Sequence, residues 1–496
     1  MNYSGLNTGN LLPEILLFIL ACIILITDLF ISEKNKRSLW DISFFGLLVV
    51  LFTAIKPFMS HRLISIPTAF AGQAFTDELT IFLRLIIISA LFASLIFSYD
   101  WVNRTPKRTG IFLFLMIICA LGGLLLANAG DLIVMVIGLE ILSLPLYVLA
   151  GFQRENKEGR EASFKYFILG SFASAFLLLG IALIFGAFQS TSLIQIFQSK
   201  ASTITNALPV AKIGSVLIIS ALAFKGGLMP FYAWIPDVYR GSPDYIVGFM
   251  ASVAKVAVFG TLIRISLVFF PVIGGSFLYV LEFLYIATVI LGNLMALWQN
   301  DIKRMLAYSS IAHAGYLLLG IMAHGKMGFS AIIFYLLIYS FTVMGSFIIT
   351  GLVKHFRGGY TLSHFDGLYK DHPIMALLMT IFMFTLAGIP PFAGFWSKLF
   401  LFNAAVSADF EEFAVIGVLA SILGVYYYIR VMVRMYMNPA PEAVSTQQKT
   451  AFPGFFTKIA LFAVAIIIIV LGFFPGAFYD SATVFMSNFI HTFPLG

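Results

Sequence analysis

Long apolar runs follow one another along nearly the whole chain and are separated by short polar loops. One bilayer crossing needs about 20 apolar residues, because a helix rises about 1.5 Å per residue and the hydrocarbon core is roughly 30 Å thick. Fourteen runs are long enough, with approximate limits 11–31, 38–56, 78–98, 110–128, 131–152, 162–188, 209–240, 244–270, 276–298, 302–322, 328–353, 372–404, 411–437 and 455–475. The runs are continuous, which excludes the alternating strands of a membrane barrel. The pattern predicts an all-α polytopic membrane protein with about 14 transmembrane helices.

The composition supports this class. Of the 496 residues, 60% are hydrophobic and 11% are charged, whereas a soluble domain carries about 25% charged residues. The net charge of +7 does not indicate nucleic-acid binding, because the lysines and arginines are spread over short loops. Cys22 and Cys119 lie in apolar runs without a CxxC pair, so we interpret them as small hydrophobic residues.

Positive charge alternates from loop to loop. Loops after odd-numbered runs are rich in lysine and arginine, at 33–37, 104–108, 154–160, 303–304 and 354–357. Loops after even-numbered runs hold little more than Arg62, Lys200 and Lys326. Since positive loops stay in the cytoplasm, we predict that both termini lie on the outer, periplasm-like face.

The chain contains an internal repeat. The matching pairs are Asp131-Leu132 with Asp301-Ile302, Tyr166 with Tyr335, Ser171-Phe172 with Ser340-Phe341, Ala251-Ser252 with Ala420-Ser421, and Pro230-Phe231 with Pro391-Phe392. Positions 131 and 301 differ by 170 residues, and the proline pair differs by 161. Each copy holds five runs, an odd number, so the two copies cross the membrane in opposite directions, as in transporters.

The repeat divides the chain into four predicted parts. They are an N-terminal three-helix segment at 1–108, a first repeat at 109–270, a second, inverted repeat at 271–440 and a C-terminal helix at 441–496.

Two runs are interrupted near their middle. Pro230 and Pro236 lie in AFKGGLMPFYAWIPDVY, residues 223–239, and Pro390 and Pro391 lie in TLAGIPPFAGFWSKL, which ends at residue 399. Proline removes a backbone donor and frees carbonyl groups, which protein or water must satisfy at this depth. A single break is more often a packing kink. A matched pair at corresponding places in the two repeats instead predicts a transport site.

Four ionisable residues lie deep in apolar runs: Glu140, Lys225, Lys255 and Lys398. A charge at the centre of a membrane helix costs at least about 2.5–3.5 kcal/mol, so such residues are paired, hydrated or functional. Burial favours the neutral amine and a nearby carboxylate favours the ammonium form. One acid and three amines therefore suit a proton relay in which Glu140 loads or unloads Lys225 and the other two lysines follow.

Each of these residues also has a structural interpretation. Glu140 and Lys225 could form an ion pair that only stabilises the fold. Lys398 could extend its amine to the membrane surface. His313 lies at nearly the place in the second repeat that Glu140 has in the first, and it is either a further relay or a hydrogen-bonded packing residue.

Three further charged residues are given structural roles. Arg84, one turn inside the third run, is expected to reach the surface or to pair with Asp77 or Glu78. Asp131 and Asp301 precede helices and suit the positive helix end.

Several of these segments resemble the antiporter-like subunits of respiratory complex I, a bacterial NADH–quinone oxidoreductase. The resemblance covers nearly the whole chain and is most specific in PFYAWIPDVYRGSP (230–243), GLEILSLPLYVLAGF (138–152) and GNLMALWQNDIKRMLAYSSIAHAGYLLLGI (292–321). The form PDVY-x-G-x-P at 236–243 is similar to the N type of these subunits in particular, and so is the length of the chain.

The resemblance implies a proton-translocating function. The family's proton path, a glutamate on helix 5 and lysines on helices 7, 8 and 12, falls on Glu140, Lys225, Lys255 and Lys398, and the last lysine is typical of the N type. It further implies a multi-pass subunit of the bacterial inner membrane that contacts other membrane subunits, lipid, protons and water. NADH, FMN, iron–sulfur clusters and quinone would bind elsewhere, because this chain has no glycine-rich nucleotide loop and no cluster-binding cysteines.

Two alternatives remain at this point. An Mrp-type or stand-alone cation/proton antiporter would share the repeat, the breaks and the buried charges. A scaffold whose buried charges move no protons would leave pumping intact when Lys225 is replaced by alanine. The PDVY-x-G-x-P segment favours the redox-driven pump over the antiporter.

Overall fold

The structure is a computed structural model that describes residues 7–59, 68–102, 108–199, 206–440 and 454–492. Arg62, Arg104, Lys107 and Lys200, which entered the orientation argument, lie outside the described residues. Nearly all described residues are helical. The α-helices are α1 (Leu12–Phe30), α2 (Ser38–Met59), α3 (Glu78–Val102), α4 (Thr109–Ala127), α5 (Leu132–Ala150), α6 (Lys157–Phe188), α7 (Leu193–Gln198), α8 (Leu208–Gly226), α9 (Trp234–Gly241), α10 (Asp244–Ile273), α11 (Gly275–Leu297), α12 (Ile302–Met322), α13 (Gly325–Arg357), α14 (Leu368–Asp371), α15 (Pro373–Ala387), α16 (Ala393–Val406), α17 (Glu411–Met437), α18 (Phe455–Phe473) and α19 (Gly476–Thr492).

Short elements complete the described chain. Three 3-10 helices lie at Thr8–Leu11, Glu33–Asn35 and Leu362–Phe365. Two strands, β1 (Thr68–Ala69) and β2 (Ala74–Phe75), pair antiparallel and form a small hairpin before α3.

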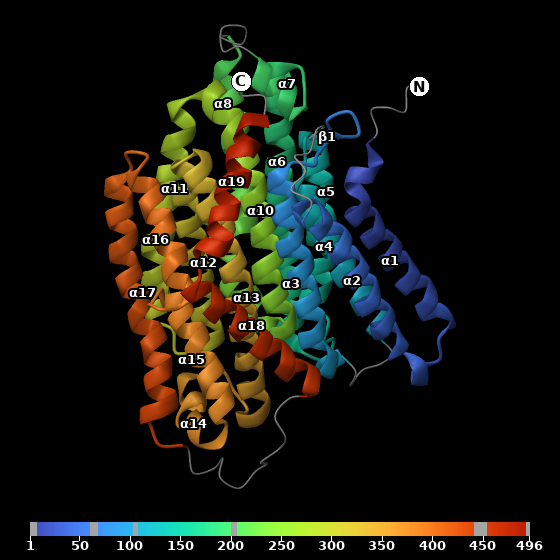
Figure 1. The fold of residues 1–496 in the computed structure, drawn as a ribbon, viewed down its shortest axis with the longest axis vertical. Coiled ribbons are helices and arrows are strands. Elements are labelled where there is room, and N and C mark those ends of the chain that lie inside the picture. The colour runs from blue at the N-terminus through green and yellow to red at the C-terminus, as the bar shows by residue number, and fades with distance from the viewer. Residues whose placement is uncertain (1–6, 60–67, 103–107, 200–205, 441–453, 493–496) are drawn as a thin grey trace.

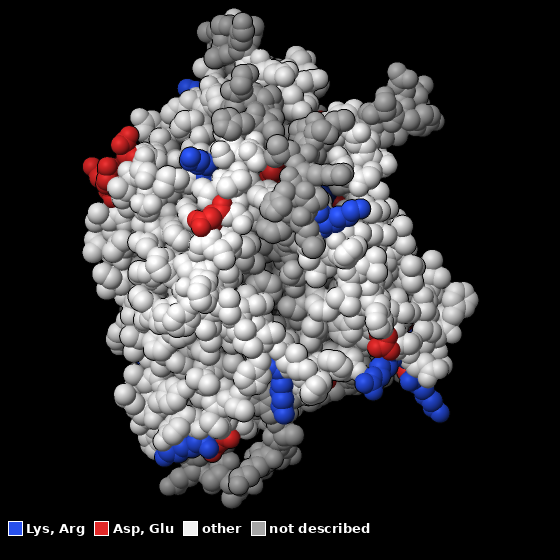
Figure 2. Space-filling view, in the orientation of Figure 1, with Lys and Arg blue, Asp and Glu red and all other residues white. Residues whose placement is uncertain are grey.

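The predicted membrane fold is confirmed. Within the described residues, thirteen helices are long and apolar enough to cross a bilayer, and the shorter α15 and α16 together form one more crossing. Figure 1 shows the helices packed as one bundle with their axes in a common general direction. In Figure 2 the charged side chains on the visible face lie towards the two ends and leave an uncharged band between them. That band is where lipid would contact the protein.

The two repeats begin with the same construction. Asp131 accepts a hydrogen bond from the backbone of Ile133 at the start of α5, and Asp301 accepts one from Arg304 at the start of α12. Each aspartate also forms an isolated antiparallel bridge, Asp131 with Ser192 and Asp301 with Thr361. Both aspartates are therefore helix caps that also tie a distant loop to the helix end.

The two breaks are also built alike. α8 stops at Gly226 and α9 starts at Trp234, while α15 stops at Ala387 and α16 starts at Ala393. Gly227 and Gly388, the residues that end α8 and α15, both have φ near +79°, which favours glycine. Side chains satisfy carbonyl groups freed by the breaks. The Trp234 indole donates to the carbonyl of Phe224 at 2.8 Å, and the Lys398 amine donates to that of Ala387 at 2.8 Å.

Pro236 was predicted to break a helix, but in the structure it lies inside one. Pro230, Pro390 and Pro391 lie between the half-helices, but Pro236 lies in the first turn of α9. Backbone N–H groups in a first turn have no helical partner, so proline is tolerated there.

Alanine at Gly227 or Gly388 should destabilise the fold. A Cβ at Gly227 would lie 2.1 Å from Cδ1 of Ile235, and one at Gly388 would lie 2.8 Å from Cδ of Lys398. The left-handed backbone adds about 1–2 kcal/mol for any other residue. We expect each variant to lower the thermal unfolding midpoint of the purified complex. Gly186→Ala is the control, because a Cβ there meets no atom within 4 Å; equal midpoints for all three variants would contradict the prediction.

The end of the chain holds a helix that the apolar pattern did not predict. α18 runs obliquely across the lower part of the bundle in Figure 1, and α19 continues to the upper end. The end of α18 touches the second break, where the Trp396 indole donates to the carbonyl of Gly472 at 2.8 Å. α19 packs against α13 and α3. The start of α1 and the end of α19 consequently lie at the same end of the bundle.

The expected partner of Arg84 was wrong. Its guanidinium contacts Glu14 of α1 at 2.7 Å and the carbonyl of Asn10 at 2.9 Å, and it is buried instead of reaching the surface. Asp77 forms an ion pair with Arg264 of α10 instead. Both pairs join helices far apart in the sequence, so no local spacing could indicate them.

Candidate functional site

Glu140 is the first, in chain order, of the four ionisable residues predicted from the sequence. It lies near the middle of α5 and is half-buried, facing α6, where the Ser174 hydroxyl donates to its carboxylate at 2.5 Å. No ion pair joins it to Lys225, although both residues are within the described chain. The alternative of a purely structural Glu140–Lys225 ion pair is therefore not what this structure contains.

Lys225 lies in the last turn of α8, directly before the first break, and is only 4% exposed. Its amine donates to the hydroxyls of Ser143 at 2.7 Å and Tyr166 at 2.9 Å. Ser143 follows Glu140 by three residues, so the two share one face of α5. Trp234 stacks on the Tyr166 ring with 4.3 Å between centroids, which holds the phenol in place.

Lys255 lies inside α10 and is 2% exposed. Its amine donates to the backbone carbonyl of Ser310 and to the hydroxyl of Tyr339 at 3.3 Å. Its nitrogen also lies 4.8 Å from the centre of the Tyr339 ring. No described acid contacts this amine, so it is a buried base held by neutral groups alone.

Tyr239 connects the surroundings of the two lysines. It lies in α9, its ring is 6.1 Å from that of Trp234, and its hydroxyl interacts with that of Ser310. Ser310 in turn accepts a hydrogen bond from Tyr339 at 2.9 Å. The segment PDVY thus supplies a hydroxyl between Lys225 and Lys255.

His313 lies one turn beyond Ser310 on α12 and is buried. Its Nδ1 lies 2.6 Å from the Tyr335 hydroxyl and its Nε2 lies 3.0 Å from that of Tyr428. A neutral imidazole has one donor and one acceptor nitrogen, so one phenol accepts a hydrogen bond from the ring and the other donates one to it. The repeat offset of 170 places His313 opposite Ser143, and it is Ser310 that corresponds to Glu140.

Lys398 lies on α16 just beyond the second break and is 6% exposed. It donates to the Ala387 carbonyl and to the Ser421 hydroxyl, both at 2.8 Å. Its amine is therefore turned inward, and the alternative of a surface-reaching lysine does not hold. A cavity of about 10 Å³ lies between Lys398 and His313, which is about the room that one water molecule needs.

These residues form a row across the bundle. α5, α8, α10, α12 and α16 contribute them in turn, and each lies near mid-helix or beside a break. Because successive members lie on different helices, each near mid-helix or beside a break, the row runs across the helix axes and not along them. A proton that uses it needs separate connections to the two membrane faces.

The hydroxyl groups between the charges were not predicted from the sequence. They belong to Ser143, Ser174, Tyr166, Tyr239, Ser310, Tyr339, Tyr335, Tyr428 and Ser421. One available signal was their helical spacing from the ionisable residues. Ser143 follows Glu140 by three positions and Ser310 precedes His313 by three.

The site has no evident metal centre. Within the described residues, no three His, Cys, Asp or Glu side chains lie close enough together to hold a metal ion. The arrangement is one of proton donors and acceptors.

Comparison with known proteins gives a consistent result. Residues 129–424, more than half of the chain, match the family described as NADH:quinone oxidoreductase/Mrp antiporter, TM. A protein of Trichlorobacter lovleyi named NADH-quinone oxidoreductase subunit N is 37% identical over 441 residues, which cover 89% of this chain and 90% of that protein.

Solved structures share the fold. A chain of respiratory complex I from Thermus thermophilus with bound Aureothin has a TM-score of 0.78 at 29% identity, covering 94% of this chain and 98% of that chain. A chain of the Mrp complex from Dietzia sp. has a TM-score of 0.81 at 20% identity, with full coverage of both chains. The second likeness concerns the fold alone.

Proposed function

The chain belongs to the NADH:quinone oxidoreductase/Mrp antiporter family and is a membrane-arm subunit of a proton-translocating NADH–quinone oxidoreductase, and we propose that it carries its own proton path. The path runs through Glu140, Lys225, Lys255 and Lys398, with His313 as a relay between the last two. NADH oxidation and quinone reduction take place on other subunits of the same complex.

One observation carries this proposal. Between Lys225 and Lys398, each buried amine is followed by hydroxyl groups, the His313 ring or a cavity of about one water. Hydroxyl and imidazole groups both donate and accept hydrogen bonds, so each can pass a proton onward. A buried network that served only packing would not need amines at three positions, each of which is costly in a membrane.

The geometry supports a switching mechanism. The Glu140 side chain is half-buried, and its carboxylate does not contact the Lys225 amine. A change of its position or protonation would alter the electrostatic field at Lys225, since charges interact strongly in a medium of low polarity. Lys225 would then release its proton towards Tyr166 and Tyr239. Lys255 would accept it and pass it on towards His313.

The proposal extends to the location of the subunit and to its cofactors. We propose that the subunit lies in the bacterial inner membrane with both termini on the periplasmic side, in line with the loop charges. Flavin, iron–sulfur clusters and quinone bind to partner subunits, and this chain binds none of them. The relatives that cover most of the chain favour the redox-driven pump over a stand-alone cation/proton antiporter.

Membrane vesicles containing the whole complex test the proposal. Glu140→Ala, Lys225→Ala and Lys255→Ala should each lower the number of protons pumped per NADH oxidised, because each removes one station of the path. Lys212→Ala is the matched control, since it removes a lysine from the same helix as Lys225 but away from the path. Normal pumping and normal NADH–quinone turnover in all three variants would refute the proposal.

A further inference from the structure

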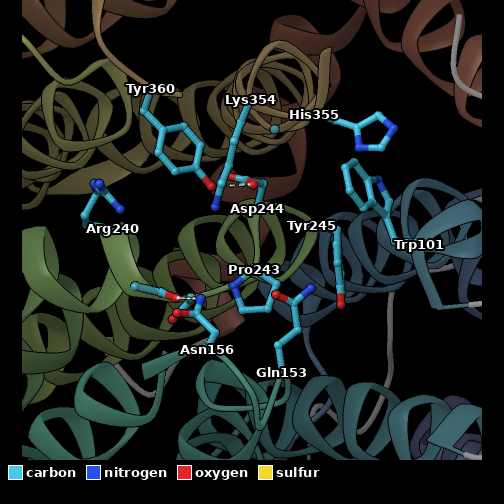
Figure 3. A pocket seen from close by; sticks show the side chains of 13 residues that line it. Trp101, Gln153, Asn156, Arg240, Pro243, Asp244, Tyr245, Lys354, His355 and Tyr360 are labelled. Carbon is cyan, nitrogen blue, oxygen red and sulfur yellow. Dashed lines mark hydrogen bonds between the residues drawn. The ribbon is translucent and has the colours of Figure 1, made fainter. Parts of the chain in front are cut away.

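A polar pocket lies at the inner end of the bundle, on the side of the positive loops. It has a volume of about 280 Å³ and lies where α9 meets α10, beside the end of α13. Figure 3 shows Gln153, Asn156, Arg240, Asp244 and Tyr360 around it. The pocket is large enough for several water molecules, whose share of liquid volume is about 30 Å³ each.

A cluster of charged and polar side chains lies where this pocket meets the protein interior. The Lys303 amine lies 2.9 Å from Oδ1 of Asp244 and donates to the carbonyl of Ser242 at 2.5 Å. The Tyr360 hydroxyl donates to Oδ2 of Asp244 at 2.9 Å. Asp244 lines the pocket and its side chain is 13% exposed, whereas that of Lys303 is 0% exposed. The pair therefore stands between the pocket and the protein interior.

Two further details indicate water at this place. The Ser242 hydroxyl lines the pocket, is buried and has no hydrogen-bond partner within the described residues. Such groups in proteins are usually satisfied by ordered water. Burial and the Asp244 carboxylate also raise the pKa of Tyr360, so this phenol keeps its proton and stays a donor.

The pocket is connected to the row of buried amines by two helices. Lys303 and Ser310 are seven residues apart on α12, which is two turns or about 10 Å along one face. Ser310 supplies the carbonyl that holds Lys255. On α9, Tyr239 precedes Ser242 by three residues and its hydroxyl interacts with that of Ser310. Both helices thus lead from the pocket to Lys255.

The charges around the pocket do not favour an anionic ligand. Arg240 is paired with Glu158 at 2.6 Å and with Asp301 at 2.7 Å, and Lys303 is paired with Asp244. Arg240 and Lys303 are thus neutralised by acids of this chain, whereas Lys354, which also lines the pocket, has its amine 4.6 Å from the centre of the Tyr360 ring. A phosphate group is usually held by several cations that are not already paired with acids, so water and protons suit the site better.

The repeat offers a comparison that separates function from fold. At the repeat offsets, Lys303 corresponds to Ile133, Tyr360 to Thr191 and Asp244 to Phe413, and none of these counterparts ionises near neutral pH. The start of α5 nevertheless has the same cap and bridge as that of α12. The shared architecture does not require the charged cluster, which belongs to the inner face alone.

We propose that Asp244, Lys303 and Tyr360 form the proton intake of this subunit. A proton passes from water in the pocket to the Asp244 carboxylate and on to the Lys303 amine, which has given its own proton through Tyr239 and Ser310 towards a neutral Lys255. One proton leaves the inner aqueous phase and one arrives at Lys255. This inference rests on the proposed proton path, whose failure the experiment below distinguishes.

Pumping measurements on the complete complex in proteoliposomes test the intake. We expect Asp244→Asn, Lys303→Met and Tyr360→Phe each to lower the number of protons pumped per NADH by as much as Lys255→Ala does. Asp371→Asn, which breaks the inner-face pair with Arg357 away from the pocket, should pump normally. If Lys255→Ala lowers pumping and all three cluster variants do not, the intake lies elsewhere. If Lys255→Ala itself pumps normally, the proposed path fails, and the intake inference fails with it.

A second experiment needs no change to the buried cluster. Gln153 lines the mouth of the pocket and is exposed, so Gln153→Cys should react with a membrane-impermeant thiol reagent in inside-out vesicles. The attached group would obstruct the pocket and lower the protons pumped per NADH. Glu155→Cys, two residues away and outside the pocket, should react equally without loss of pumping. Normal pumping by fully labelled Gln153→Cys would overturn the proposal.

Discussion

Replacing Asp77 by asparagine will cost the folded chain about 3–5 kcal/mol, because it leaves a buried arginine without its counter-charge. The Arg264 side chain is 0% exposed and holds both carboxylate oxygens of Asp77, at 2.6 and 2.8 Å. It also donates to the Ala127 carbonyl and to the Thr80 hydroxyl, both at 2.8 Å. The pair therefore ties α3 and α10 to the end of α4 at one point.

Asparagine is the informative replacement at this position. It keeps the size of the side chain and an oxygen for the N-terminus of α3, where Asp77 accepts from the backbone of Thr80. The loss is then that of the charge, and it should lower both the yield of assembled complex and its thermal unfolding midpoint. Asp41→Asn, an exposed acid in the first turn of α2, should change neither.

The double variant Asp77→Leu/Arg264→Leu provides the second comparison. Removing both partners leaves no unpaired buried charge, so it should be more stable than Asp77→Asn. An Asp77→Asn complex that is as stable as the unchanged complex would show that the pair contributes little.

Replacing Lys398 by methionine will abolish the pumping that this subunit contributes. Lys398 is the last amine of the row, and only a cavity of about one water separates it from His313. Methionine matches its length but carries no proton, and it leaves the carbonyl of Ala387 without its donor. The measurement is the number of protons pumped per NADH by the reconstituted complex.

Two companion variants identify the cause of that loss. Lys398→Arg keeps the positive charge but cannot release a proton, because a guanidinium stays protonated in proteins. It should pump no better than the methionine variant, and restored pumping would show that charge alone is required. The double variant Lys255→Met/Lys398→Met should pump no fewer protons per NADH than either single variant, because each substitution blocks the same route. Additive losses would indicate two parallel routes.

The sequence alone determined the membrane class, the limits of most helices, the two breaks and the positions of the buried charges. The reason is that the bilayer imposes local rules. A crossing needs about 20 apolar residues, and a charged residue or a proline inside such a run can be recognised directly in the amino-acid sequence. The repeat was also visible, because Asp131 and Asp301 recur in register. Lys225, Lys255 and Lys398 are buried and Glu140 is half-buried, whereas their action as one proton path stays a prediction.

Only the tertiary structure decided which groups those residues touch. Lys225 meets Ser143 and Tyr166, and Lys255 meets Ser310, across sequence separations of 55 to 82 residues. These helices are apolar on nearly every side, so no stripe of hydrophobic positions indicates which side faces a given neighbour. Lys303 illustrates the same limit. It counted as a loop charge in the sequence, yet it is fully buried against Asp244, because the packing of α12 on α10 sets the direction of its side chain.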